Sequence, residues 1–252
     1  KQYGQRMVQT FLDQWPQSVD LHAYAESCAV DEFASNLFVH DLLMVSPELV
    51  AFKTQWQSVP KANGDVSADP IRSQRKDAGK GFKWDAVRFS HKVYAIFHAA
   101  KNCTSDWLIW MDADMVCHSR VYESDLDRLC PTDQDLCYLG RANKFSECGL
   151  YAMNLKSNAI TEFLTKFQLM YDQAETGIFS LAEWHDSFVF DCVRQQTALR
   201  QLNWSQGLVV GEGHPLINCE WGSYLDHLKG QRKTLGHSKA KDLLVEIGRA
   251  HV

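Results

Sequence analysis

The sequence contains no long apolar run and no excess of positive charge. Its unbroken apolar stretches, of which Trp107–Met111 is one, are no longer than five residues, whereas a helix that crosses a bilayer needs about 20. The 252 residues carry a formal net charge of −5, and proteins that bind duplex nucleic acid are usually basic. We therefore expect neither a transmembrane segment nor a nucleic-acid-binding surface.

The eight cysteines include no Cys-x-x-Cys pair, so a zinc knuckle or a thioredoxin-type site has no support. The chain also shows no stretch typical of a secretory signal peptide. Several of the cysteines lie in apolar segments, where a free cysteine behaves as a small hydrophobic residue. We therefore expect reduced thiols and a cytoplasmic protein.

The sequence has no internal repeat, low-complexity run or linker-like segment, which favours a single domain over residues 1–252. The clearest helix is expected over residues 82–101, where apolar residues recur three and four positions apart. The apolar run 107–111 is typical of a strand buried on both faces. Strand-like and helix-like segments alternate, and this alternation predicts an α/β protein with a layered sheet.

The remaining segments are assigned by the same patterns. Further helices are expected over residues 7–12, 47–56, 160–171 and 183–194, and further strands over 19–25, 136–139, 149–153 and 208–210. Residues 57–80 combine proline, glycine and many charges, which indicates a long loop that acts as a lid. Residues 222–252 form a polar tail that we expect to belong to the ligand site.

Two carboxylates, Asp112 and Asp114, follow the apolar run directly. Open α/β sheets bind ligands at the carboxyl ends of their strands, and residues i and i+2 of an extended backbone share a face. Carboxylate oxygens suit hard cations such as Mn²⁺ or Mg²⁺. The alternative is a solvated acidic turn, since Asp125 and Asp133 begin two further Asp-x-Asp patterns. Only the first pattern follows an apolar strand, which favours a metal-binding pair.

Residues 227–233, His-Leu-Lys-Gly-Gln-Arg-Lys, combine an imidazole, a glycine and cations. His227 can complete a metal shell that carboxylates begin. Gly230 lets the backbone approach a phosphate closely, while Arg232 and Lys233 offer it positive charge. The alternative is a solvated basic tail.

The Asp-x-Asp pair at a strand end, followed late by His-x-x-Gly-x-x-Lys, resembles the glycosyltransferases of the GT-A fold. The late motif is similar to that of glycosyltransferase family eight, the glycogenin and galactosyltransferase group. This resemblance implies a Rossmann-like mixed sheet with helices on both faces. It also implies that Asp112, Asp114 and His227 bind Mn²⁺ or Mg²⁺. Lys233 would then bind the diphosphate of a nucleotide-sugar, and a UDP-sugar is favoured because the similar families use UDP.

Residues 183–187, Glu-Trp-His-Asp-Ser, resemble the Trp-His-Asp-Glu-Ser stretch of the blood-group transferases. The likeness implies that Asp186 is catalytic through positioning of the sugars. The glutamate that is the candidate nucleophile of that family is absent, because Ser187 takes its place. A retaining reaction would then proceed on one face of the sugar, with the leaving phosphate helping to deprotonate the acceptor. The alternative is an ordinary helix start.

Residues 145–151 resemble the Phe-Asn-x-Gly-Val stretch of family eight, which borders the donor sugar and the acceptor. The likeness implies that Gly149 permits close approach of a ligand and that Glu147 is a catalytic residue that hydrogen-bonds sugar hydroxyls. The alternative is the ordinary start of a strand. Arg88 and Lys92 precede the motif strand, where enzymes of this fold contact donor phosphate or sugar, unless both residues form a solvated face.

These patterns together predict a metal-dependent, retaining glycosyltransferase that moves a sugar from a nucleotide diphosphate donor to a saccharide or another hydroxyl acceptor. A nucleotidyltransferase or phosphohydrolase would use the same acidic pair, but no Gly-rich phosphate loop is present near the start. A sugar-binding module would explain the eight tryptophans, but not the acidic pair. His214 and His237 compete with His227 as metal ligands. GT-A domains open with a strand, which we expect upstream of Lys1 or outside this numbering.

Overall fold

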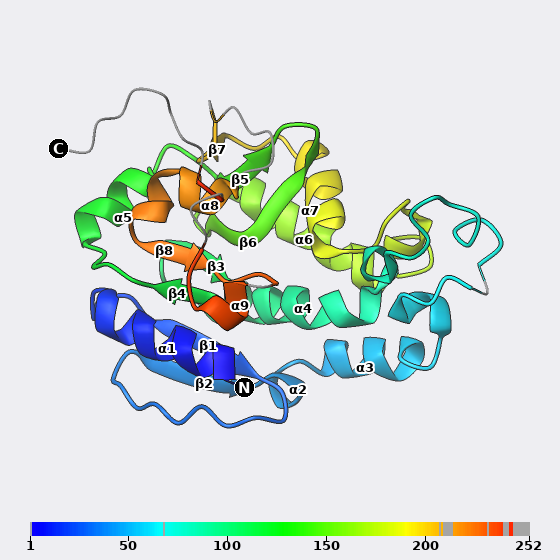
Figure 1. Ribbon diagram of the computed structural model, residues 1–252, viewed down its shortest axis with the longest axis horizontal. Helices are drawn as coiled ribbons and strands as arrows, with labels where there is room; N and C mark the ends of the chain where they lie inside the picture. The colour runs from blue at the N-terminus through cyan, green and yellow to red at the C-terminus, as the bar shows by residue number, and fades with distance from the viewer. Residues whose placement is uncertain are drawn as a thin grey trace.

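Helices and strands alternate along the chain in the computed structural model (Figure 1). The structure describes residues 2–67, 69–206, 208, 214–230, 232–238 and 242–243. The helices are α1 (Gln2–Gln14), α2 (Leu42–Val45), α3 (Pro47–Trp56), α4 (Ala86–Asn102), α5 (Glu123–Leu129), α6 (Asn158–Asp172), α7 (Asp186–Gln195), α8 (Pro215–Asn218) and α9 (Arg232–Leu235). The strands are β1 (Leu21–Ala25), β2 (Leu37–Asp41), β3 (Trp107–Met111), β4 (Met115–Cys117), β5 (Leu136–Arg141), β6 (Lys144–Asn154), β7 (Gln201–Asn203) and β8 (Leu225–His227). The predicted α/β class is confirmed.

The described strands form a mixed four-stranded sheet and two strand pairs. The order in the sheet is β3-β6-β5-β7, with β6 antiparallel to β3 and β5, and β7 parallel to β5. Strands β1 and β2 form a parallel pair, and β4 and β8 an antiparallel pair. In Figure 1 the β1–β2 pair lies at the lower edge of the view, below β4 and β8.

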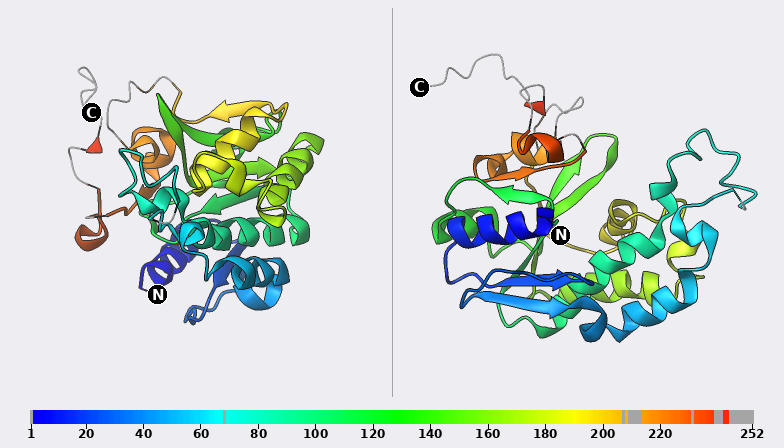
Figure 2. Two further views of the ribbon diagram at one scale, coloured as in Figure 1. Left: turned by 90° about the vertical axis from the view of Figure 1, so that its right-hand side faces the viewer. Right: turned by 60° about the horizontal axis from the view of Figure 1, so that its bottom comes forward.

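Apolar side chains cover both faces of the four-stranded sheet, because successive residues of a strand point to opposite sides. On β6, Tyr151 and Met153 join a core with residues of α3, α4, α6 and α7. Leu150 and Ala152 join a second core with residues of α1, α5 and α8. The right-hand view of Figure 2 shows α1 well apart from α3. Helices therefore pack on both faces, as predicted.

Helix α4 begins at Ala86, four residues after the start that the periodicity predicts. Residues 81–84 form a 3₁₀ turn. Asp85 then caps the helix, since its carboxylate accepts a hydrogen bond from the Arg88 amide at 3.1 Å. Phe82 consequently lies before the helix, and 51% of its surface is exposed. The exposed Phe82 ring lines the cleft of the candidate site.

Strand β3 has the predicted bounds but not the predicted burial. All five of its residues are only partly buried, although the apolar run predicts burial on both faces. The reason is that β3 hydrogen-bonds to β6 along one edge, whereas its other edge pairs with no strand in the described part of the chain. The expectation of full burial is wrong.

Several short elements carry no readable sequence pattern. Strands β2, β4, β7 and β8 have three to five residues, too few for a periodic signal. Of the strand expected at 208–210, residues 209–210 lie outside the described residues.

All eight cysteines are free thiols. No helix within the described ranges combines the length and the apolar content that a bilayer span requires.

The long loop at residues 57–80 is fixed to the segment that leads into α7. Asp69 is buried and accepts a hydrogen bond from the Arg72 amide at 2.9 Å. The Arg72 guanidinium donates to the Leu181 carbonyl oxygen at 3.0 Å and lies 4.3 Å from the ring centre of Trp184. These contacts hold the loop against the segment before α7, while the role of the loop as a lid stays a prediction.

Candidate active site

The antiparallel pairing of β4 with β8 brings the late histidine to the acidic pair. Its register places His227 opposite Met115, and the Leu228 amide donates to the Asp114 carbonyl oxygen at 2.9 Å. His227 Nε2 lies 2.9 Å from Asp114 Oδ1 and 3.7 Å from Asp112 Oδ2. The ligand atoms of Asp112, Asp114 and His227 all lie within 4.8 Å of one another. Two carboxylates and an imidazole form a donor set that fits Mn²⁺ or Mg²⁺.

Gly149 makes room for the His227 ring. A Cβ atom at this position would lie 2.3 Å from His227 Cε1 and 2.6 Å from its Nδ1, distances that real side chains do not tolerate. The Gly149 carbonyl oxygen also accepts a hydrogen bond from the Asp112 amide at 2.9 Å. The close approach that the sequence predicts at Gly149 is therefore, in this structure, that of the histidine.

Lys92 links the cluster of Asp112, Asp114 and His227 to α7 from a buried position. Its Nζ donates to Asp112 Oδ1 at 2.9 Å, to Asp186 Oδ2 at 2.8 Å and to the Cys148 carbonyl oxygen. Burial opposes its charge, but the two carboxylates outweigh burial and hold the pKa of Lys92 well above the ordinary lysine value. All three ammonium protons are thus engaged within the protein.

Asp186 is the first residue of α7, and its carboxylate faces the site. Its Oδ1 accepts a hydrogen bond from the Ser187 amide at 2.8 Å, while Oδ2 faces Lys92. Burial would raise the pKa of Asp186, but Lys92 lowers it below the ordinary value, so the group is ionised at neutral pH. His185 precedes it, and its Nε2 lies 2.9 Å from Glu183 Oε2.

Glu147 is almost completely buried and already bound. Its carboxylate forms an ion pair with Lys229, and Arg141 Nη1 lies 3.5 Å away. Burial acts to raise the pKa of Glu147, but Lys229 and His227 bring it down to about 2. Neighbouring His214 is buried without a hydrogen-bond partner for either ring nitrogen among the described residues, and burial lowers its pKa to about 4.

The 227–233 segment contributes Gly230 and Lys233 to the lining of the cleft, but not Arg232. Gly230 and Lys233 line the open cleft, and Lys233 Nζ lies 3.0 Å from Asp114 Oδ2. Arg232 does not line it: its guanidinium pairs with Asp242 at 3.1 Å and donates to the His227 carbonyl oxygen at 3.3 Å. His237 is a surface residue whose Nδ1 lies 2.8 Å from the Ser238 carbonyl oxygen.

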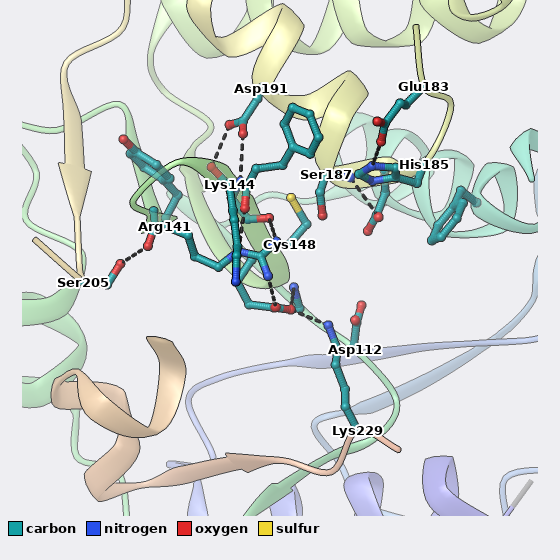
Figure 3. A pocket seen from close by; sticks show the side chains of 18 of the residues that line it. Asp112, Arg141, Lys144, Cys148, Glu183, His185, Ser187, Asp191, Ser205 and Lys229 are labelled. Carbon is teal, nitrogen blue, oxygen red and sulfur yellow. Dashed lines mark hydrogen bonds and ion pairs between the residues drawn. The ribbon is translucent and has the colours of Figure 1, made fainter. Parts of the chain in front are cut away.

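The cleft has a volume of about 1400 Å³. Asp112, Asp114, Glu147, Asp186 and Arg88 line it, whereas Lys92 does not. Figure 3 shows Arg141 and Lys144 on one side of the cleft, His185 and Glu183 on the other, and Asp112 near Lys229. The structure therefore brings most of the predicted site residues to one cleft.

A further acidic residue of the cleft, Asp191, belongs to none of the sequence motifs. Its carboxylate accepts hydrogen bonds from the Ser146 amide at 2.8 Å and the Ser146 hydroxyl at 2.6 Å. Arg194, three residues further on α7, pairs with it at 2.9 Å. Helical spacing predicts the Asp191–Arg194 pair, but only the fold brings both residues to β6. These contacts fasten the start of β6 to α7.

Comparisons with known proteins give a family match and a similar solved structure. Residues 67–186 match the model of glycosyl transferase family 2, a segment that contains the Asp112–Asp114 pair and ends at Asp186. The crystal structure of mouse xyloside xylosyltransferase 1 in its apo form is similar, with 11% identity and a TM-score of 0.42 over 77% of this chain and 76% of that one. No curated protein sequence matches. The family match does not extend to the expected likeness with family eight. The chain is a glycosyltransferase with an α/β fold of the GT-A type.

Proposed function

We propose that this glycosyltransferase is metal-dependent and takes its sugar from a nucleotide diphosphate donor, with UDP favoured. The observation that carries the proposal is the cluster of Asp112, Asp114 and His227 at the edge of a 1400 Å³ cleft. Mn²⁺ or Mg²⁺ held there would neutralise the diphosphate as the glycosidic bond breaks.

Lys233 is the residue that we assign to the donor diphosphate. It lines the cleft, and Asp114, at 3.0 Å, is its one carboxylate neighbour among the described residues. A cation held by Asp114 would compete for that carboxylate, which releases the ammonium group toward a phosphate. Gly230 lies beside it with φ of +57° and open space around its Cα, so a phosphate oxygen can approach the backbone. Arg232 then supports the His227 backbone.

Asp186 is the residue that we assign to the sugars and the acceptor. Its ionised carboxylate lines the cleft and is held by Lys92, which also holds Asp112 at 2.9 Å. One buried ammonium group thus sets the distance between the metal cluster and Asp186. An acceptor hydroxyl that donates to Asp186 is oriented toward the donor sugar. Glu147, which faces two cations, contributes to the same wall of the cleft.

We propose retention of configuration without a covalent intermediate. The two carboxylates that the sequence predicts as catalytic are ion-paired, Asp186 with Lys92 and Glu147 with Lys229, and Ser187 stands where a nucleophile would be expected. The leaving phosphate then assists deprotonation of the acceptor on the same face. An NMR spectrum of the product that shows an inverted anomer overturns this part of the proposal.

The test of the proposed function is ligand binding followed by thermal unfolding. UDP, GDP, ADP and CMP are each added with Mn²⁺ or with EDTA. A ligand present at 100 times its dissociation constant adds about 2.7 kcal/mol to the free energy of unfolding. We expect this stabilisation for UDP only when Mn²⁺ is present.

Two matched variants assign the effect to the site. Asp114→Asn is expected to remove the Mn²⁺-dependent stabilisation, while Asp127→Asn, at an exposed residue of a second Asp-x-Asp pattern on α5, keeps it. Equal behaviour of the two variants contradicts the metal assignment. Hydrolysis of a phosphorus–oxygen bond, with the sugar–oxygen bond intact, would instead favour a phosphohydrolase or nucleotidyltransferase.

A further inference from the structure

The charges of the cleft are unequally paired. Every carboxylate that lines it has a cationic partner within 4 Å, and these carboxylates are Asp112, Asp114, Glu147, Glu183, Asp186 and Asp191. A carboxylate that faces a bound cation contributes little net charge to the space in front of it. The sign of the cleft is therefore set by the cations that have no such partner.

Three cations of the cleft have no carboxylate within ion-pair distance among the described residues: Lys80, Arg88 and Lys144. All three side chains are exposed. Lys80 precedes the 3₁₀ turn at 81–84, Arg88 lies on the first turn of α4, and Lys144 begins β6. Since these cations come from three separate elements, they are not a single solvated helix face.

Each of these cations stands one or two residues from a phenylalanine that lines the same cleft, namely Phe82, Phe89 and Phe145. The three rings surround His185, with centroid distances of 6.1, 6.2 and 5.5 Å. His185 immediately precedes Asp186 in the chain. An aromatic wall, with cations that have no carboxylate partner among the described residues, thus lies beside Asp186, whose carboxylate we assign to the acceptor.

We propose that this wall, formed by Phe82, Phe89 and Phe145, is an acceptor subsite, and that its acceptor is an anionic saccharide carrying a carboxylate or phosphate group. The inference rests on the proposed function of Asp186. Aromatic rings offer a flat apolar surface to the C–H face of a sugar ring. Lys80, Arg88 and Lys144 supply charge for the anionic group, and an arginine can bind it through two parallel hydrogen bonds.

The donor diphosphate is a less suitable occupant for these three cations. It is accommodated at the metal cluster, where Lys233 lies 3.0 Å from Asp114. Arg88 and Lys92 occur one turn apart on α4, but Lys92 is turned inward to Asp112 and Asp186. That buried lysine separates the carboxylate of Asp112 from that of Asp186, and the aromatic wall surrounds His185, the residue before Asp186. Arg88 thus moves from the donor role that the sequence predicts to an acceptor role.

The test compares ligands that differ only in charge, by titration calorimetry in the absence of any donor. Tetragalacturonate is paired with its fully methyl-esterified form, and maltotetraose with its 6-phosphate. We expect one charged member to bind at least tenfold more tightly than its neutral partner, and which one binds distinguishes a carboxylate from a phosphate. Inorganic phosphate alone serves as the probe for an anion without a sugar ring, and we expect it to bind at least tenfold more weakly.

Variants of the cations and of one ring assign the effect to residues. Arg88→Gln with Lys144→Gln is expected to raise the dissociation constant of the charged ligand at least twentyfold and to leave the neutral ligand unchanged. Phe82→Ala is expected to raise the dissociation constants of both ligands by about the same factor. The control is Lys156→Gln, which removes a charge of the same sign outside the cleft, at a side chain that is 71% exposed. It is expected to change neither affinity.

Equal binding of charged and neutral ligands, or an unchanged affinity in the double variant, overturns the inference. A double variant that keeps saccharide binding and loses UDP binding with Mn²⁺ also overturns it, because the cations then serve the donor. If UDP with Mn²⁺ fails to bind the wild-type protein, the proposed function fails separately, while the saccharide titration still reports on charge selectivity.

Discussion

The two ends of the cleft are built in opposite ways. One end contains the proposed metal ligands and is called the metal end: Asp112, Asp114 and Glu147 are held there by Lys92, Lys233 and Lys229, and the His227 side chain has no exposed surface. At the aromatic end, the rings and cations are partly or largely exposed and the cations lack ionic partners among the described residues. The metal end is fixed before any ligand binds, whereas the aromatic end offers its groups directly to a ligand. Substitutions should therefore reduce stability more at the metal end than at the aromatic end.

The largest effect on stability is expected from Lys92→Met. The substitution leaves the carboxylates of Asp112 and Asp186 facing one another without a cation, and removal of one partner from a buried ionic group costs about 3–5 kcal/mol. Urea unfolding monitored by circular dichroism measures the loss. The control is Lys101→Met, in the last turn of the same helix and exposed. A loss below about 1 kcal/mol for Lys92→Met would show that this end is not fixed by the lysine.

Gly149→Ala tests the close packing behind the histidine. The added methyl group would lie 2.3 Å from His227 Cε1, so the ring or the strand must shift, at about 1–3 kcal/mol in unfolding free energy. We also expect the affinity for Mn²⁺ to fall by about 10–100-fold, as for residues that orient metal ligands. Gly79→Ala is the matched control, since no atom lies within 4 Å of its added carbon. An unchanged Mn²⁺ titration for Gly149→Ala contradicts the assignment of His227.

Glu147 gives the metal end a pH dependence of stability. Its pKa is about 2 in the folded protein and about 4.3 in an unfolded chain. The ionised carboxylate therefore stabilises the fold above about pH 4.3, and this contribution is lost as the pH falls toward 2. Glu147→Gln should lower the unfolding free energy at pH 7 by about 1–3 kcal/mol and flatten its dependence between these pH values. If the variant keeps the wild-type dependence of unfolding free energy on pH, that dependence belongs to another titrating group.

The smallest effect on stability is expected at the aromatic end. Arg88→Gln and Phe82→Ala remove exposed groups, and surface substitutions of this kind usually change the unfolding free energy by less than about 0.5 kcal/mol. Thermal unfolding of both variants, with Gly149→Ala alongside, measures the contrast between the two ends. A loss of unfolding free energy above about 2 kcal/mol in either variant would contradict this difference between the two ends, because the aromatic end would then also be structurally fixed.

Sequence reasoning reached the metal end further than the aromatic end. The apolar run before Asp112 and the spacing that begins at His227 are each patterns of residues that lie close together in the sequence. Such local patterns can be recognised without the structure, and here both predict the same site. The partners of Lys92 could not be predicted, because Asp186 lies 94 residues away. Strands β4 and β8, which bring His227 to Asp114, have three residues each and leave no periodic signal.

The aromatic end could not be recognised for a different reason. Whether Lys80 or Lys144 lacks an ionic partner depends on the whole surface around it, which a sequence does not describe. The exposure of Phe82 likewise depends on a cap: Asp85 starts α4 after the ring, whereas the periodic pattern places the ring inside the helix. The partial burial of β3 has a similar origin, because strand pairing decides it and hydrophobicity does not.

The β4–β8 pairing has a consequence for the chain as a polymer. His227 and Asp114 are 113 residues apart, so a cation that binds both would link two distant parts of the sequence. An unfolded chain does not hold these two residues together, so an ion bound to both favours the folded state by its binding free energy. Metal binding would thus act as a reversible cross-link, and its removal by a chelator would release both parts at once.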